Sequence, residues 1–472
     1  MFLDGPGGSG KSKIINEVLH YCKCFCSLIN VPFTKNTILV TASTGVAATH
    51  INGQTLHSAC YLGTKETTED QIRQFSNVRL IIVDEISMIS KQTLTTLNNK
   101  LKNLRNRQKY YGGLNIVFIG DFRQLKPVGC SNSTIYSDRN FLEWYTAINT
   151  YIELKGRYRF FLDKQWGDIL DRFHKGKPSS RDFEIINQKV IMNNSNTLQN
   201  GNIIPNNIRY CTKVNKDRDA IHTGLFIKLL NDRQNSHNCI IVLADNLEIA
   251  TDSDKKNNFK KIKNICQFYS ECGEDDIKFN DRNTSRMDPV LKLYYNCSIM
   301  LTNNMDVEKG MANGTEAHLK KIILKPNEKL FEIKMKNTLY NPKNNNNNEY
   351  IMCKAIFASQ IKEVQLESPV NQNKLVLNPI SFTFNIKLNL KSDIYSKMNL
   401  NFNRKMKAIQ LPFVSNSATT CHKLQGATCE NLCINSFDYS SNWPYVALLR
   451  VKTLNGLFVK EPLNYKKRFL YR

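Results

Sequence analysis

The sequence lacks an apolar run long enough to span a bilayer, and the opening residues MFLDGPGG lack the basic start of a secretory leader. It is also short of acidic residues, since 41 Asp and Glu stand against 65 Lys and Arg in 472 residues, a formal net charge of +24. We therefore expect neither a membrane-spanning nor a secreted protein. So large a positive excess predicts a polyanionic partner, and without a membrane segment it favours nucleic acid over an anionic membrane surface.

The 14 cysteines lack the spacing of a disulfide framework or of a zinc site. They are scattered through a large chain, which is typical of reduced thiols in an intracellular protein. In the segment CKCFC, the residues Cys22, Cys24 and Cys26 have no histidine following at ligand distance, and they continue a helical pattern. We interpret them as structural thiols.

Short apolar runs alternate with amphipathic stretches in the first part of the chain. The stretch from Lys91 to Lys109 has the period of a helix. The candidate buried strands, each ending in a polar residue or a turn, are 37–43, 80–85 and 114–121. This alternation predicts an α/β fold with a parallel sheet, which binds ligands at the carboxyl ends of its strands. We place this first domain at 1–150.

The length of the chain suggests two to four domains. We predict a second α/β domain in two parts, 151–322 and 405–472. The region between them, 323–404, has a different texture. In ISFTFNIKLNL, apolar residues alternate strictly from Ile380 to Leu390, the pattern of a strand with one buried face. LFEIKM and YIMCKAIFA are similar, so 323–404 is predicted to be a small all-β insert.

The stretch GPGGSGKS fits the phosphate-loop pattern, with a short strand before it and a helical run after it, as that motif requires. Glycines let backbone N–H groups turn inward around phosphates, Lys11 neutralises the β- and γ-phosphates, and the Ser12 hydroxyl coordinates Mg²⁺. The motif therefore predicts ATP and Mg²⁺ as ligands. The residues predicted to bind them are Gly5, Gly7, Gly8, Ser9, Gly10, Lys11 and Ser12.

Acidic and amide side chains follow the next two candidate strands. In LIIVDEIS, we predict that Asp84 holds Mg²⁺ through water and that Glu85 orients and deprotonates the attacking water. The alternative is an exposed strand end with two solvated acids. In GDFRQLKPVG, the amide of Gln124 is expected to hold the γ-phosphate or the water. The alternative there is a polar turn capped by Asp121.

Hydroxyl-bearing residues gather in TASTGVAATHINGQTLHSA, which also contains small residues that let one backbone approach another. Side chains of this kind donate to phosphates without requiring a particular base. The candidates are Thr44, Thr55, His57 and Ser58. Taken alone, His57 is better explained as a structural histidine.

The segment WPYVALLRVKTLNGLFV, residues 443–459, is predicted to contain a buried strand that ends at Arg450. A lone arginine is usually solvated or paired with an acid. At the carboxyl end of a strand in a two-domain NTPase, Arg450 is instead a candidate arginine finger, a residue that stabilises negative charge on the γ-phosphate.

The chain resembles the Pif-type (petite integration frequency) DNA helicases of superfamily 1 along nearly its whole length. The matching motifs occur in the family's order: GPGGSGKS, TASTGVAA…GQTLHS, IIVDEISM, YYGGLNIVFIGDFRQLKPV, LKGRYRF, LTNNMDVEKGMANGTEAHL, TCHKLQGAT and YVALLRV. Helicases carried by Helitron transposons share this set, so both remain open.

The resemblance implies two RecA-like domains with ATP between them and an SH3-like barrel inserted in the second, which agrees with the β-rich texture of 323–404. It implies ATP-driven 5′→3′ translocation on single-stranded DNA with unwinding of tailed duplexes. Repair, recombination or telomere maintenance are the expected settings. We expect a monomer in the nucleus or the mitochondrion.

The resemblance also implies roles for residues that match its motifs. The nucleotide site of the first domain matches Lys11, Ser12, Asp84, Glu85 and Gln124. The second domain offers two arginines, which match Arg159 and Arg450. The segment coupling the domains matches Gly310, Asn313 and Gly314, and the segment linking DNA to ATP matches His422, Lys423, Gln425 and Gly426. The DNA strand is expected at Thr44, His57 and Thr420.

The sequence departs from the family in three places. The family carries a glutamine that reads adenine before the phosphate loop, whereas Met1 stands four residues before Gly5, so we expect that element to be absent and the sequence to be shortened. Leu449 replaces a usual serine, and Cys421 a usual β-branched residue. A degenerate single-stranded nucleic-acid binder is therefore the alternative to a helicase. A phosphate-loop NTPase acting on a protein partner is disfavoured by the basic charge and the late motifs.

Overall fold

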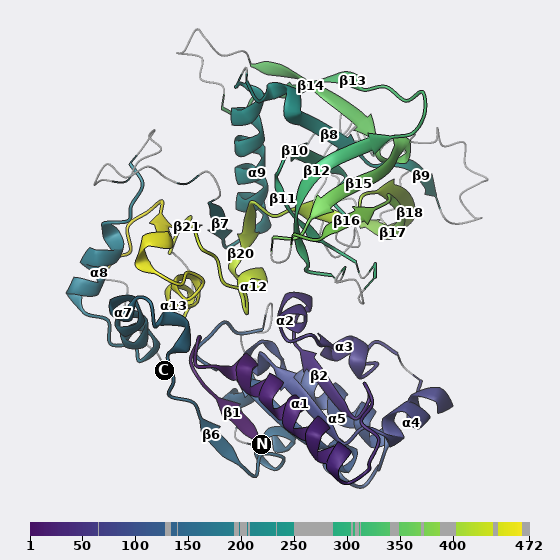
Figure 1. Ribbon diagram of the computed structural model, residues 1–472, viewed down its shortest axis with the longest axis vertical. Helices are drawn as coiled ribbons and strands as arrows, with labels where there is room; N and C mark the ends of the chain where they lie inside the picture. Colours follow the sequence, from purple (N-terminus) through teal and green to yellow (C-terminus); the bar gives the residue numbers. More distant parts are fainter. Residues whose placement is uncertain are drawn as a thin grey trace. The chain divides into compact units, whose positions relative to one another are not determined.

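The computed structural model describes residues 1–64, 66–127, 134–138, 140–192, 198, 205, 208–232, 234–249, 287–303, 305–306, 311, 313–339, 349–369, 372–387, 403–437 and 442–464 (Figure 1). The chain divides into two compact units. The first unit comprises Met1–Asn215 and Thr419–Arg472, and the second comprises Lys216–Ala418. The domain boundaries expected after residues 150, 322 and 404 are not tested by this division and stay predictions.

The first unit contains a sheet of parallel strands in the order β3-β2-β4-β5-β1-β6, of which β1, β2 and β6 are labelled in Figure 1. Its strands are β1 Phe2–Asp4, β2 Ile38–Ala42, β3 Gln54–Thr55, β4 Leu80–Asp84, β5 Asn115–Gly120 and β6 Tyr151–Glu153. The three strands predicted from the sequence are confirmed as β2, β4 and β5. Within β4, Ile81 and Val83 join one apolar cluster and Ile82 joins another. Burial on both faces explains why these strands read as continuous apolar runs.

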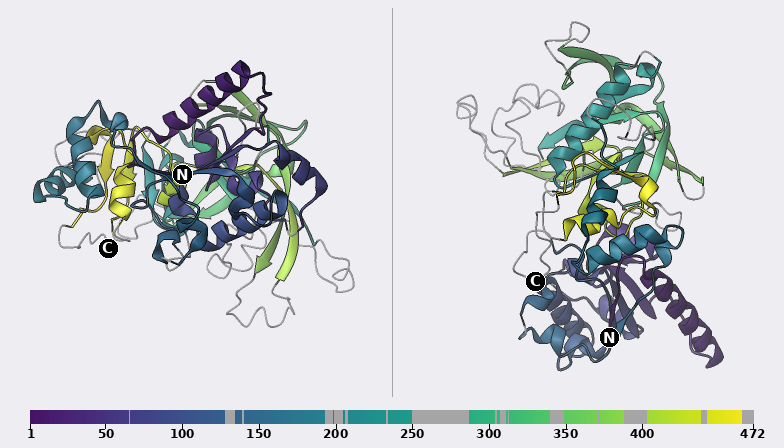
Figure 2. Two further views of the ribbon diagram at one scale, coloured as in Figure 1. Left: turned by 90° about the horizontal axis from the view of Figure 1, so that it is seen from below. Right: turned by 90° about the vertical axis from the view of Figure 1, so that its left-hand side faces the viewer.

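Helices connect the strands of this sheet. They are α1 Lys11–Leu28, α2 Gly45–His50, α3 Leu56–Ala59, α4 Glu69–Ser76, α5 Lys91–Leu104 and α6 Leu142–Tyr145. The cysteines of CKCFC lie in α1, whose carboxyl end projects beyond the strands in Figure 2. The helix predicted over 91–109 ends at Leu104. The prediction was wrong at that end because the side chain of Asn106 accepts the N–H of Gln108 and forms a local turn that competes with the helix.

The remainder of the first unit is built around a smaller sheet in the order β20-β7-β21-β22. Its strands are β7 Arg209–Thr212, β20 Ala418–Thr420, β21 Leu432–Ile434 and β22 Leu457–Val459. The accompanying helices are α7 Lys164–His174, α8 Ser180–Asn187, α12 Cys421–Leu424 and α13 Trp443–Leu448. One apolar cluster, which includes Trp166, Leu432 and Trp443, fills the space between them.

The segment before Arg450 is a helix, so the predicted buried strand was wrong. Every residue of α13 is buried. A short all-apolar run therefore gave no period to distinguish a strand from a helix. Pro444 occupies the first turn of α13, a position that proline favours, and was the signal for a helix start. Arg450 follows the carboxyl end of this helix.

The second unit packs helix α9 (Asn215–Leu230) with antiparallel and mixed sheets (Figure 1). One sheet has the order β10-β8-β14-β13, with β8 Cys239–Leu243, β10 Val290–Tyr294, β13 Phe331–Lys336 and β14 Tyr350–Phe357. A second has the order β16-β15-β12-β11-β19, with β11 Ser298–Leu301, β12 Glu316–Leu324, β15 Ile361–Glu367, β16 Lys374–Leu377 and β19 Phe413–Ser415. The third pairs β17 Ile380–Lys387 with β18 Asn403–Gln410 and β9 Asp245–Ile249.

The strands predicted in LFEIKM, YIMCKAIFA and ISFTFNIKLNL are confirmed as β13, β14 and β17, although Leu388 and Leu390 lie outside the described residues. These sheets also include strands from before residue 322. The SH3-like character expected for 323–404 stays a prediction. Across the described part of the chain, no helix has the length and apolar character needed to cross a membrane.

Candidate nucleotide-binding and catalytic site

The phosphate loop connects β1 to α1 and turns where the sequence predicted. Gly8 and Gly10 have φ of +86° and +93°, in the left-handed region that favours glycine. A Cβ on Gly8 would stand 2.6 Å from the Cβ of Arg159, so the loop passes close to that arginine. The ammonium of Lys11 donates to the carbonyls of Gly5 at 2.7 Å and Pro6 at 3.1 Å.

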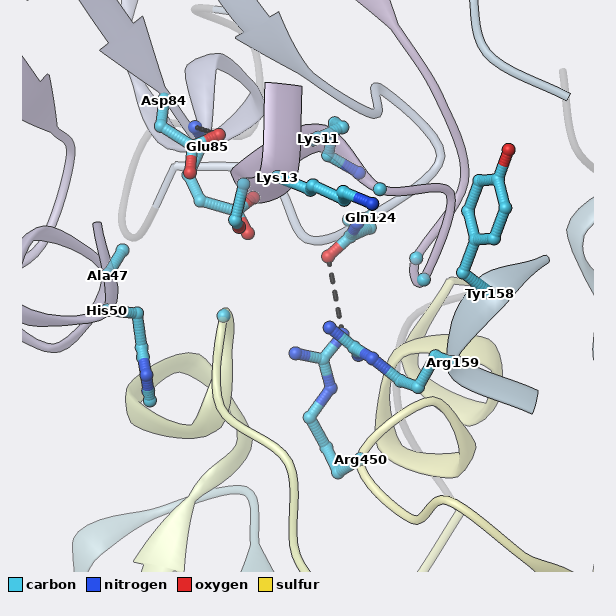
Figure 3. A pocket seen from close by; sticks show the side chains of 15 residues that line it. Lys11, Lys13, Ala47, His50, Asp84, Glu85, Gln124, Tyr158, Arg159 and Arg450 are labelled. Atoms are coloured by element: carbon cyan, nitrogen blue, oxygen red, sulfur yellow. Dashed lines mark hydrogen bonds between the residues drawn. The ribbon is translucent and has the colours of Figure 1, made fainter. Parts of the chain in front are cut away.

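A cavity of about 340 Å³ opens beside this loop, and all of its lining belongs to the first unit. Every residue predicted to be catalytic lines it. The lining residues are Gly7, Gly8, Gly10, Lys11, Ser12, Lys13, Ala47, His50, Asp84, Glu85, Gln124, Tyr158, Arg159, Gly426 and Arg450. Figure 3 shows Arg159 and Arg450 side by side, across the cavity from Asp84 and Glu85. Residues far apart in the sequence therefore converge on one small space.

The paired acids are buried, which excludes the alternative of a solvated strand end. Asp84 ends β4 and accepts the N–H of Glu85 at 2.9 Å, and Glu85 has a φ of +54°, a strained value for a residue with a side chain. Burial, followed by the negative charge of Glu85, raises the pKa of Asp84 to about 7 despite the opposing charge of Lys11. This carboxylate pair is thus placed where a cation would be strongly favoured.

The donor atoms near Asp84 fit Mg²⁺. The Ser12 hydroxyl and the Asp84 carboxylate both line the cavity, and these hard oxygen ligands suit that ion. In the described residues, no group of three His, Cys, Asp or Glu is arranged to hold a metal. An ion here would therefore depend on further oxygens, such as those of water or phosphate.

Arg159 and Arg450 place positive charge on the side of the cavity opposite the paired acids. Arg450 is 1% exposed, and it donates to the Oε1 of Gln124 at 3.4 Å and to the carbonyl of Val446 at 2.9 Å. Burial, and then the charge of Arg450, lowers the pKa of Arg159 to about 10. Two guanidinium groups so close together repel each other, and an anionic ligand between them would relieve this repulsion.

The predicted nucleic-acid residues occupy several environments. Thr44 caps α2 by accepting the N–H of Ala47 at 3.2 Å, and Thr55 caps α3 by accepting the N–H of Ser58 at 3.3 Å. His57 and Ser58 are exposed, whereas Thr420 is buried. The caps give both threonines a local structural role. Their contact with nucleic acid stays a prediction.

The segment expected to link nucleic acid to ATP contacts one of the paired acids, Glu85. Gln425, predicted among the nucleic-acid residues, is 1% exposed and donates to the Oε2 of Glu85 at 3.1 Å and to the Oγ of Ser87 at 3.3 Å. His422 is more open but partly covered, and burial lowers its pKa. Lys423 lies between these two residues in the sequence. Gln425 therefore faces the nucleotide site in this conformation.

Several lining residues were missed by the sequence analysis. Lys13 directly follows the phosphate loop, and Tyr158 directly precedes Arg159, so adjacency to a motif was the available signal. His50 ends α2 and gave no signal in the sequence. Of the segment expected to couple the domains, Gly310 lies outside the described residues, while Asn313 and Gly314 precede β12.

Comparisons with known proteins find similarity to the same family that the motifs resemble. Residues 1–165 match the family model described as PIF1-like helicase. The ATP-dependent DNA helicase Pif1 of Psychrobacter sp. is 40% identical over 140 residues, covering 27% of this chain and 20% of that protein. The uncharacterized protein 030L of Invertebrate iridescent virus 6 is 26% identical over 98% of this chain and 87% of that protein.

Among solved structures, Pif1 from Bacteroides bound to ssDNA superposes with a TM-score of 0.64 at 18% identity, covering 100% of this chain and 90% of that one. This likeness shows the fold, which is the α/β fold of two RecA-like domains with a parallel sheet. The chain matches about a fifth of the length of the Psychrobacter helicase. Residues 1–165 are therefore similar to the PIF1-like helicases, and the fold of the whole chain is similar to that of a Pif1 structure.

Proposed function

We propose that the chain is an ATP-dependent DNA helicase that translocates 5′→3′ on single-stranded DNA and unwinds duplex. One observation carries the proposal: the phosphate loop, two acids, an amide and two arginines meet in a single cavity. This is the set of groups that phosphoryl transfer to water requires. The net charge of +24 supports a polyanionic partner.

The cavity supplies each part of the hydrolysis mechanism. Backbone N–H groups of the loop and the ammonium of Lys11 bind the phosphates, and Lys11 exchanges the carbonyls of Gly5 and Pro6 for phosphate oxygens. Ser12 and Asp84 would hold Mg²⁺, which when bound neutralises phosphate charge.

The remaining groups act on the attacking water and on the γ-phosphate. The Glu85 carboxylate accepts a proton from the water, while Gln124 orients the water or the γ-phosphate. Arg159 and Arg450 stabilise the negative charge that develops on the transferred phosphoryl group. The hydrogen bond between Arg450 and Gln124 joins the arginine to the amide across the cavity.

The nucleic-acid partner is proposed from the charge of the chain and from its relatives. One solved structure is described as Bacteroides Pif1 bound to ssDNA, and a second is described as the structural basis for DNA unwinding at forked dsDNA by two coordinating Pif1 helicases. For this chain we propose single-stranded and tailed duplex DNA as substrates and a monomer as the ATP-hydrolysing species. Repair, recombination or telomere maintenance in the nucleus or mitochondrion is proposed from the family alone.

The direct test of the polarity is unwinding of duplexes that carry a single-stranded tail on either the 5′ or the 3′ end. With ATP and Mg²⁺, strand separation is expected from the 5′-tailed duplex, because a 5′→3′ motor loaded on that tail moves toward the junction. A blunt duplex serves as the control. Separation of the 3′-tailed duplex alone would refute the polarity.

A further inference from the structure

Helix α13 and the residue after it, Leu449, pack against the phosphate loop. The hydroxyl of Tyr445 accepts the N–H of Gly7 at 3.4 Å. The δ-carbons of Leu449 stand 2.7 and 2.9 Å from the position that a Cβ on Gly7 would occupy. Tyr445 and Leu449 are each 1% exposed, so the two side chains that contact Gly7 are themselves buried. Gly7 is therefore held from one side by a hydrogen bond and an apolar side chain.

The hydroxyl of Tyr445 has a second partner that fixes its direction. It donates to the Oδ2 of Asp121 at 3.3 Å, while His174 lies 3.4 Å from the Oδ1 of the same carboxylate. The rings of His174 and Tyr445 have centroids 5.2 Å apart. The hydroxyl of Tyr445 is thus hydrogen-bonded, and its ring packs against the ring of His174.

The protonation states of the pair agree with this direction. Burial raises the pKa of Asp121, but the hydrogen bond and charge of His174, with smaller contributions from Lys11 and the N–H of Arg123, outweigh it and lower the pKa overall. Burial and the negative charge of Asp121 raise the pKa of Tyr445. Asp121 therefore accepts, and the hydroxyl retains the proton that it donates.

We propose that Tyr445 is a positioning residue for nucleotide binding, acting through Gly7 to hold the phosphate loop in its binding shape. Its hydroxyl is the middle of one hydrogen-bonded path, which runs from the Gly7 N–H through Tyr445 to the Asp121 carboxylate. The path ties the amino-terminal end of the loop to the residue that follows β5. This inference rests on the proposed function, because it assigns the cavity to a nucleoside triphosphate.

Replacing Tyr445 with phenylalanine removes the hydroxyl and keeps the ring. The Gly7 N–H and one Asp121 oxygen then lose a partner, and we expect the Kd for ATP to rise about tenfold, the scale of the one hydrogen bond that holds the loop at Gly7. The KM for ATP should rise similarly, with kcat at saturating ATP within about twofold of the parent, because the loop and not the reacting groups is disturbed.

Tyr111→Phe is the matched control. Tyr111 is also buried, at 3% exposed, and its hydroxyl donates to the carbonyl of Glu143 at 2.6 Å, away from the cavity. Thermal unfolding and titration with a fluorescent ATP analogue would be measured on all variants. We expect Tyr111→Phe to lower the unfolding temperature and to leave the Kd unchanged. An unchanged Kd in Tyr445→Phe, or an equal rise in both variants, would overturn the positioning role.

Two further variants separate this inference from the proposed function. Asp121→Asn should weaken ATP binding, and adding Tyr445→Phe to it should cost less than the two single effects combined, since both act on one path. Additive effects would contradict the path. Lys11→Ala tests the nucleotide site itself. If that variant binds ATP as well as the parent does, both the proposed function and this inference are contradicted. Loss of binding in Lys11→Ala with none in Tyr445→Phe would remove only the inference.

Discussion

Replacing Arg450 with alanine is expected to lower DNA-stimulated ATP hydrolysis by about 10³-fold or more, the scale on which an arginine finger contributes. The guanidinium is buried, lines the cavity and donates to Gln124, so it can reach charge that develops on the γ-phosphate. Steady-state hydrolysis at saturating ATP and single-stranded DNA is the measurement. Because the finger acts on the transition state, ATP affinity should change far less than kcat.

The controls for this prediction address folding, since Arg450 also donates to the carbonyls of Leu424 and Val446. Arg450→Lys keeps the positive charge but loses the planar guanidinium and its several N–H donors. Compared with Arg450→Ala, it should therefore restore stability more than activity. Arg172→Ala removes another arginine of the first unit, one that bonds Asp182 at 2.8 and 2.6 Å outside the cavity. It should cost stability and keep hydrolysis. A folded Arg450→Ala protein with hydrolysis near that of the parent would show that Arg450 is structural.

Replacing Glu85 with glutamine is expected to lower hydrolysis by about 10²–10⁴-fold, the usual contribution of a general base. The amide keeps the shape of the side chain, and its oxygen can still accept the Nε2 of Gln425. ATP binding should therefore survive, which a titration with ATP would check. Glu143→Gln is the matched control, because Glu143 accepts the hydroxyl of Thr95 at 3.3 Å outside the cavity. Loss of ATP binding together with unfolding would indicate a structural Glu85.

The parallel sheet of the first unit could be predicted because β2, β4 and β5 pack against apolar clusters on both faces and are separated by helices. Once β4 and β5 were located, Asp84, Glu85 and Gln124 had to lie at one edge of the sheet, since parallel strands end together. The phosphate loop is a local motif whose glycines and lysine act within one turn. These features depend on short-range sequence.

The features that could not be predicted depend on long-range packing. The all-apolar α13 has no periodicity to read, because it is buried on every side. The end of α5 is decided by one side chain, Asn106, that competes with the helix.

The position of Gln425 is a second case of this kind. Its contact with Glu85 joins residues 340 apart in the chain, and no local pattern specifies it. The path from Gly7 through Tyr445 to Asp121 has the same character. A motif can therefore identify the residues of a site, but it does not show which of them are in contact.

The most direct test of the account is ATP hydrolysis measured with and without single-stranded DNA, on the parent chain and on Lys11→Ala. The account predicts slow hydrolysis alone, a marked rise with single-stranded DNA, and no hydrolysis in Lys11→Ala under either condition. The rise is expected because nucleic acid is the proposed partner of a site that Gln425 joins to the candidate DNA-contacting segment. Tight binding of single-stranded DNA with no hydrolysis at all, or hydrolysis that ignores both DNA and the loss of Lys11, would contradict it.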